Sequence, residues 1–152
     1  MKRAHLLIAG VMCYVLLFKA HAQLLPSPDK LLPEKALLFA KLPEQFIVSN
    51  LWIEKLFAGP DSGAVKILLA ANNYFEGVVT AKVQVNINVT NINIKSTNYD
   101  GAMLSLSKIT RGLTTNYIGR IISIHYGDVF LLIQENNTLY FRKKKQSFVI
   151  TE

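Results

Sequence analysis

Residues 83–94 hold the feature that most constrains the fold, a strict alternation of apolar and polar residues. The apolar residues at every second position are Val83, Val85, Ile87 and Val89. Such alternation is typical of a strand with one buried face. The parity then reverses, because the next apolar residues are Ile92 and Ile94. A one-residue shift turns every side chain over, so the pattern predicts a bulge or tight turn near Thr90 and Asn91, and two strands instead of one.

Short segments rich in β-branched and aromatic residues follow one another beyond Pro43, separated by clusters of Gly, Asn, Asp and Ser. The segments are 46–57, 65–71, 77–94, 102–109, 117–125, 129–134 and 139–150. With 77–94 split in two, the number of strands suits a closed barrel. We therefore predict an all-β domain over residues 46–152, an eight-stranded up-and-down antiparallel barrel whose small interior can hold one ligand.

The segment before the barrel, residues 23–45, is rich in leucine and contains four of the five prolines. Pro33 suits the first position of a helix. The apolar residues that would form one stripe of this helix are Leu37, Leu38, Phe39 and Leu42. The pattern predicts a short helix between Pro33 and Pro43 that packs on a core formed elsewhere.

The first 22 residues have the pattern of a secretory signal peptide. Lys2 and Arg3 precede an apolar run over 4–18, and Ala20 and Ala22 supply the small residues of a cleavage site. The run is shorter than the roughly 20 residues of a membrane-spanning helix, so we predict secretion and no transmembrane segment, with an uncleaved signal anchor as the alternative. The single cysteine, Cys13, lies in this segment, so the rest of the chain has no disulfide.

Two acceptor sequences for N-glycosylation lie in the predicted barrel. They are Asn88-Val89-Thr90 and Asn136-Asn137-Thr138. Because the chain has the pattern of a secreted protein, these sequences predict glycans on Asn88 and Asn136.

Sequence patterns for catalysis are sparse. His125 is the only histidine after residue 22, the acidic residues are scattered, and neither a Gly-x-Ser-x-Gly motif nor a phosphate-binding glycine loop occurs. A zinc site would need more histidines, cysteines or clustered carboxylates than this segment offers. We therefore predict no enzymatic activity, no metal site and no cofactor.

One run of basic residues lies near the end of the chain. It consists of Arg142, Lys143, Lys144 and Lys145. Such a run can bind anionic lipid, glycan or nucleic acid, although the signal peptide argues against nucleic acid. Alternation along a strand would instead send its members to opposite faces, and lysines are also common on solvated strand edges.

Three features occur in the order found in lipocalins. Asn50-Leu51-Trp52, which follows residues 42–46, resembles the Gly-x-Trp motif at the start of the first lipocalin strand. Residues 125–132 resemble the second motif, a turn followed by an apolar strand. Arg142 is placed like the arginine that packs over the motif tryptophan, here Trp52, in a cation–π contact. The chain thus resembles a lipocalin over residues 42–145.

The resemblance implies a secreted carrier that holds a small hydrophobic molecule inside the barrel. From strand parity we expect seven wall residues: Val83, Val85, Ile87, Leu104, Leu106, Ile122 and Ile124. The same side chains can instead fill a dry core. A second hypothesis is a secreted interaction or defence protein that binds anionic lipid or glycan through its basic run, 142–145.

Overall fold

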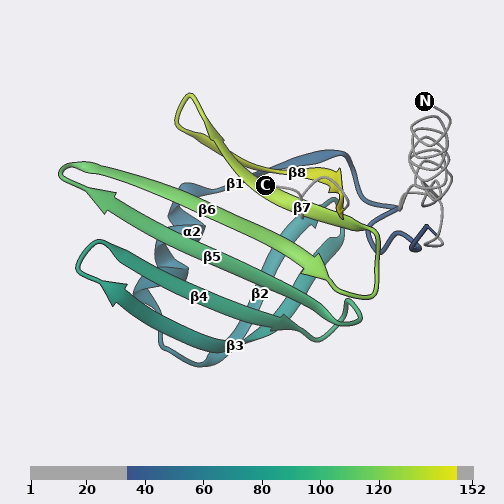
Figure 1. Cartoon of the computed structure of the whole chain (residues 1–152), viewed down its shortest axis with the longest axis horizontal. Helices are drawn as coiled ribbons and strands as arrows, with labels where there is room; N and C mark the ends of the chain where they lie inside the picture. The colour runs from purple at the N-terminus through teal and green to yellow at the C-terminus, as the bar shows by residue number, and fades with distance from the viewer. Residues whose placement is uncertain (1–33, 147–152) are drawn as a thin grey trace, which may run out of the picture. The chain divides into compact units, whose positions relative to one another are not determined.

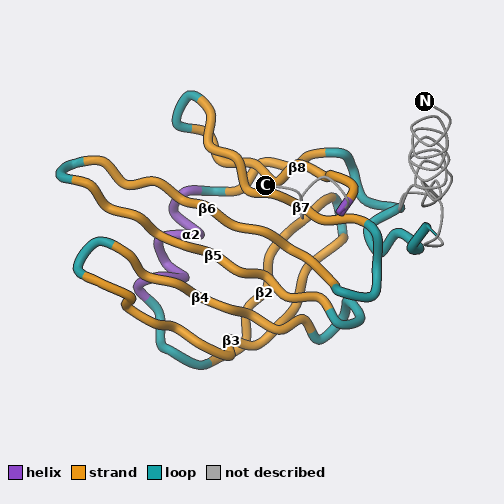
Figure 2. Tube along the Cα trace, viewed as in Figure 1, coloured by secondary structure: helices purple, strands orange, loops and turns teal. Residues whose placement is uncertain are grey.

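The computed structural model describes residues 34–146, which form eight antiparallel strands and one helix (Figures 1 and 2). The strands make one sheet that curls into a nearly closed barrel, so the predicted barrel architecture is confirmed. The predicted signal peptide, residues 23–33 of the leucine-rich segment and residues 147–152 lie outside the described residues.

Every strand is antiparallel to its neighbours, and the strand order is β1-β8-β7-β6-β5-β4-β3-β2. The elements are β1 (Gln45–Val48), α2 (Asn50–Ala58), β2 (Gly63–Ala70), β3 (Asn73–Asn86), β4 (Val89–Ser96), β5 (Ala102–Arg111), β6 (Thr114–Ser123), β7 (Asp128–Glu135) and β8 (Thr138–Lys145). β1 and β2 are the two edges of the sheet and do not pair with each other. The barrel is therefore open at the β1–β2 seam, and α2 connects the two edges.

The strand predicted over residues 46–57 is confirmed for 46–48 and wrong for the rest, because the chain turns from strand to helix at Ser49. The Ser49 hydroxyl oxygen accepts a hydrogen bond from the backbone N–H of Trp52 at 3.4 Å and so caps α2. Ile53 and Phe57, one helical turn apart, are the buried residues of this helix. They belong to the core of the barrel.

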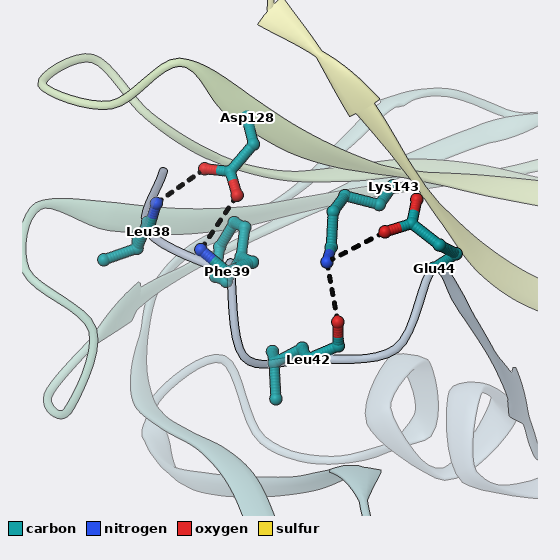
Figure 3. A network of polar contacts seen from close by, with 6 residues as sticks. All are labelled: Leu38, Phe39, Leu42, Glu44, Asp128 and Lys143. Carbon is teal, nitrogen blue, oxygen red and sulfur yellow. Dashed lines mark hydrogen bonds and ion pairs between the residues drawn. The ribbon is translucent and has the colours of Figure 1, made fainter. Parts of the chain in front are cut away.

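The helix predicted between Pro33 and Pro43 is also wrong. Residues 34–37 have no regular structure, and a turn follows over 38–41. The backbone N–H groups of Leu38 and Phe39 donate to the two carboxylate oxygens of Asp128, each at 2.8 Å (Figure 3). These two N–H groups thus bond to a side chain of β7 and not to carbonyls of a helix. The Phe39 side chain that follows is fully buried in the core.

A second contact fixes the same segment to β8 (Figure 3). The Lys143 ammonium group donates to the Leu42 carbonyl at 2.6 Å and lies 3.3 Å from the Glu44 carboxylate. Its side chain turns toward the barrel interior, with the nitrogen 5.9 Å from the centre of the Phe130 ring. Together with Asp128, Lys143 ties residues 38–44 to the two neighbouring strands.

A bulge in β3 decides which residues face inward. The register with β4 shifts between Val79 and Ala81. Before the shift the odd-numbered residues of β3 face inward, and after it the even-numbered residues do. Lys82 therefore lies opposite the buried Ile92. The chain reverses at residues 87–88, a few positions before the turn predicted near Thr90. The split into two strands is confirmed, whereas the inferred inward face of the second half of β3 is wrong.

The interior of the barrel is filled with aromatic and aliphatic side chains. Phe130 lies 5.0 Å from Phe39 and 5.1 Å from Phe46, measured between ring centroids, and Phe46 lies 5.4 Å from Phe141. Such close ring pairs add to the stability that burial itself supplies. α2 adds Ile53 and Phe57 from its buried face, so the centre of the barrel is a packed core.

We expect Asp128→Asn to lower the free energy of unfolding by about 2 kcal/mol, because an amide leaves one of the two backbone N–H groups without an acceptor. Asp128 is 1% exposed, so water cannot replace the lost acceptor. Urea denaturation measures the change, with the exposed Asp100→Asn as control. Equal stability of the two variants would contradict the role given to Asp128.

Candidate functional site

Two of the seven expected wall residues face the barrel interior. Leu104 and Leu106 on β5 are buried and belong to the hydrophobic core. They belong to one cluster with buried side chains of the other strands and of α2, and neither lines the two pockets found among the described residues. The interior therefore uses these leucines for stability.

The inward orientation expected for the other five residues is wrong. Val83 and Val85 follow the β3 bulge and are 54% and 57% exposed, and Ile87 at the β3–β4 turn is 88% exposed. On β6 the inward residues are Ile121 and Ser123, both buried. Their neighbours Ile122, half-buried, and Ile124, exposed, lie on the other face. Isoleucines occur at both odd and even positions of residues 121–124, so the sequence does not show which face is buried. Ile122 and Ile124 were therefore expected on the wrong face.

The best candidate site is a pocket of about 330 Å³ between α2 and the edge strand β2. It is partly open to solvent. Its lining residues come from α2, the loop that follows it, β2 and β3: Trp52, Lys55, Leu56, Gly59, Pro60, Ser62, residues 63–66 and Val79. A pocket of this size lies within the range of small-molecule sites, about 300–1,000 Å³.

Apolar side chains form one side of this α2–β2 pocket. Trp52, Leu56 and Val65 are half-buried residues that pack on the core, and Val79 is buried. Each of the first three has one side on the core and leaves part of its surface open. The sequence did not reveal this group, because Trp52 and Leu56 were placed on a strand. The helical spacing of Trp52, Ile53, Leu56 and Phe57 after the capping Ser49 is the signal that would have found it.

Two lysines add positive charge to the pocket lining. Lys66 lies 2.7 Å from the Glu76 carboxylate, and this hydrogen bond raises the pKa of Lys66. Its nitrogen also lies 4.3 Å from the centre of the Tyr74 ring. Lys55 is exposed and forms no ion pair within residues 34–146. Lys55 is therefore the cation that remains available to an anionic ligand group.

The position of the helical wall depends on Lys82, which points inward after the β3 bulge. Its ammonium group donates to the Gly59 carbonyl at 2.6 Å and lies 3.6 Å from the Asp61 carboxylate. The Lys82 side chain is only 14% exposed. A cation at the carboxyl end of a helix is favourable for the helix dipole, so Lys82 both stabilises α2 and fixes one end of the pocket.

A second, more polar pocket of about 270 Å³ lies where α2 meets the β3–β4 turn and β5. Its lining residues are Glu54, Phe57, Ala58, Ile87, Asn88, Thr90, Lys108 and Thr110. Asn88 is exposed in that turn, and Asn136 is exposed in the β7–β8 turn with a positive φ of 46°. Both side chains are therefore sterically available, and glycosylation of Asn88 and Asn136 stays a prediction.

The cation–π pair predicted between Trp52 and Arg142 is wrong. Trp52 lies on α2, and the Arg142 guanidinium lies 5.1 Å from the ring of Tyr140 and donates to its hydroxyl oxygen at 3.1 Å. The pKa of Tyr140 is raised, chiefly by a hydrogen bond with Glu135. The structure thus gives the arginine a different aromatic partner, on its own strand.

The basic run 142–145 does not form one continuous patch. Lys143 points inward to the Leu42 carbonyl, and Lys145 pairs with the Glu34 carboxylate at 2.9 Å. Arg142 and Lys144 lie on the outer face of β8, since their register partners Leu131 and Val129 alternate with the inward Phe130 and Leu132. Strand alternation has therefore divided the run between two faces.

Comparison of the chain with protein-family models, curated proteins and solved structures finds no match. Residues 34–146 contain no group of His, Cys, Asp and Glu side chains arranged to hold a metal ion. No helix within the same residues is long and apolar enough to cross a membrane. The geometry of the α2–β2 pocket is therefore the main observation that bears on function.

We expect Lys82→Met to lower the free energy of unfolding by about 1–2 kcal/mol, because the Gly59 carbonyl loses its charged donor. The end of α2 loosens as a result, and the emission of Trp52, the only tryptophan, shifts to longer wavelength. Chemical denaturation and fluorescence spectra test both effects, with the exposed Lys41→Met as control. An unchanged Trp52 spectrum together with unchanged stability would refute this role of Lys82.

Proposed function

We propose that this protein binds a small amphipathic molecule in the α2–β2 pocket. The supporting observation is the group of half-buried apolar residues, Trp52, Leu56 and Val65, beside one cation without a described partner, Lys55. Apolar surface supplies most of the affinity of such a site, and a few polar groups set orientation. The ligand class that matches is a short hydrocarbon chain with an anionic head.

The proposal keeps the expected function but moves the binding site. Buried aromatic and aliphatic side chains of the described residues occupy the interior, whereas the α2–β2 pocket offers apolar surface that is already partly exposed. Secretion, which rests on the pattern of residues 1–22, would make the protein an extracellular carrier. The lipocalin relationship stays a prediction that rests on the sequence motifs.

Ala64→Phe tests the location of the site, because Ala64 lines the α2–β2 pocket and a phenyl group there takes up its volume. We expect the affinity for octanoate, followed by Trp52 fluorescence and by calorimetry, to fall at least tenfold while the melting temperature stays unchanged. Ala58→Phe, in the second pocket, is the matched control. Loss of binding in the Ala58 variant alone would assign the ligand to the second pocket and overturn the proposal.

Lys55→Gln tests the anionic head. We expect the affinity for octanoate to fall about threefold, the size of one exposed charge contact, and the affinity for octanol to stay the same. If both ligands lose affinity equally, Lys55 contributes through its packing and not through its charge. If neither ligand binds the unmodified protein, the proposed function is wrong.

A further inference from the structure

The second pocket, of about 270 Å³, lies between α2 and the neighbouring ends of β4 and β5. Its strand side consists of Thr90 of β4 and of Lys108 and Thr110 of β5. Thr90 and Lys108 lie opposite each other in the register of the two strands. All three residues continue the even-numbered positions of the buried Ile92 and Leu106, so they belong to the inward face of the sheet. The second pocket is therefore a polar mouth at one end of the barrel interior.

The lining of the second pocket combines carbon surface with hydrogen-bonding groups. Phe57 and Ala58 of α2 and Ile87 of the β3–β4 turn supply the carbon surface. The Lys108 ammonium, the Glu54 carboxylate and two threonine hydroxyl groups supply donors and acceptors. Neither Lys108 nor Glu54 forms an ion pair within residues 34–146, so both charges are available to a ligand. A sugar ring has the matching character, because its C–H groups form an apolar face and its hydroxyl groups surround it.

An attachment point for a sugar lies on the rim of the second pocket. Asn88 lines the pocket, is exposed and begins the sequence Asn88-Val89-Thr90, an acceptor for N-glycosylation in a secreted chain. The backbone of Asn88 is held on both sides. Its N–H donates to Asn86 Oδ1 at 2.8 Å, and its carbonyl accepts from the backbone N–H of Thr110, also at 2.8 Å. A sugar on Asn88 therefore starts from a fixed point beside the pocket.

The surroundings of Asn88 differ from those of the other acceptor, Asn136. Asn136 is exposed in the β7–β8 turn and lines neither of the two pockets described above. Asn88 instead follows Ile87, which lines the second pocket and is 88% exposed. A sugar ring seated in the pocket would remove part of the Ile87 surface from water, which is favourable. The two acceptor sequences thus predict glycans with different consequences for stability.

We propose that Asn88 is glycosylated and that the first N-acetylglucosamine of its glycan occupies the second pocket. The ring packs on Ile87 and Ala58, and its polar groups bond to Lys108 and Thr110. The pocket volume of about 270 Å³ lies just below the range for drug-sized ligands, about 300–1,000 Å³, so it suits one sugar and leaves the outer sugars in solvent.

The modification uses a lipid-linked oligosaccharide diphosphate as donor. The amide nitrogen of Asn88 forms a bond to C1 of the first sugar, the bond from C1 to the diphosphate breaks, and the amide loses one proton. The proposal rests on the expected secretion, because this reaction takes place in the secretory pathway. The second pocket shares no lining residue with the α2–β2 pocket, so the proposal does not depend on the proposed small-molecule function.

The first experiment compares the two acceptor sites in the full chain secreted from eukaryotic cells. Mass spectrometry of its peptides is expected to find a glycan on Asn88. We expect Asn88→Gln to lower the melting temperature by about 4 °C, and Asn136→Gln to lower it by less than about 1 °C. An endoglycosidase that leaves only the first sugar is expected to keep the melting temperature of the unmodified sequence. The same Asn88→Gln change in protein from bacteria, which carries no glycan, is expected to have no effect.

The second experiment tests whether the stabilising sugar lies in the second pocket. Ala58→Phe places a phenyl group in that pocket, and Ala58 is exposed, so the fold tolerates the change. In this background we expect Asn88→Gln to leave the melting temperature unchanged, since the sugar has lost its place. Ala64→Phe, in the α2–β2 pocket, is the matched control and keeps the full effect of Asn88→Gln. Each comparison is made within one background, so any effect of the phenyl group itself cancels.

Several outcomes overturn the proposal. A secreted protein without a glycan on Asn88 does so directly, and so does an equal loss of stability in Asn88→Gln and Asn136→Gln. A loss that persists in the Ala58→Phe background shows that the glycan acts from solvent. A loss that also occurs in bacterial protein assigns the effect to the asparagine and not to the sugar. Octanoate binding enters none of these measurements, so failure of the small-molecule function is distinguishable from failure of this proposal.

Discussion

The buried carboxylate of Asp128 is the interaction on which the arrangement of the chain's first described segment depends. Two backbone N–H groups, those of Leu38 and Phe39, converge on its oxygens across about 90 residues of chain. A buried carboxylate needs hydrogen-bond donors, and the two backbone N–H groups need acceptors. The same contact supplies both, and it also leaves these N–H groups unavailable to a helix. The contact also places Phe39 against Phe130, where it joins the aromatic core. Strand β1 follows this segment and pairs with β8, so the Asp128 contact also positions one edge of the sheet.

The other edge of the sheet depends on α2. Instead of continuing as a strand that would pair with β2, the chain after Ser49 forms a nine-residue helix. Its buried face, Ile53 and Phe57, completes the core, and its half-buried residues remain along the open seam. Because residues 50–58 form a helix and not a strand, one side of this helix completes the core and another side lines the α2–β2 pocket. The α2–β2 pocket is a consequence of this topology, because β2 is an edge strand that has a strand neighbour on one side only.

The sequence predicted the strand content well, because alternation and turn residues are local signals. It did not predict which face of β3 is buried, since the bulge after Val79 depends on pairing with β4 and leaves no clear mark in the sequence. The helix at residues 50–58 was missed although Ser49 and the spacing of Ile53 and Phe57 indicate it. The Asp128 contact joins residues far apart in sequence, so no local pattern could reveal it. For these reasons the inward orientation expected for the second half of β3 and the strand position expected for Trp52 were wrong.

The basic residues show how pairing changes the meaning of a charged run. In the sequence, 142–145 is one cluster, yet the strand sends Lys143 inward, where its ammonium group meets a carbonyl and an aromatic face. Register brings Arg120, distant in sequence, into the row of Arg142. An outward charge costs little solvation and leaves the core unchanged, whereas an inward one must find partners. Lys143 and Lys82 each have a carbonyl and a carboxylate as partners, so these two charges stabilise the fold.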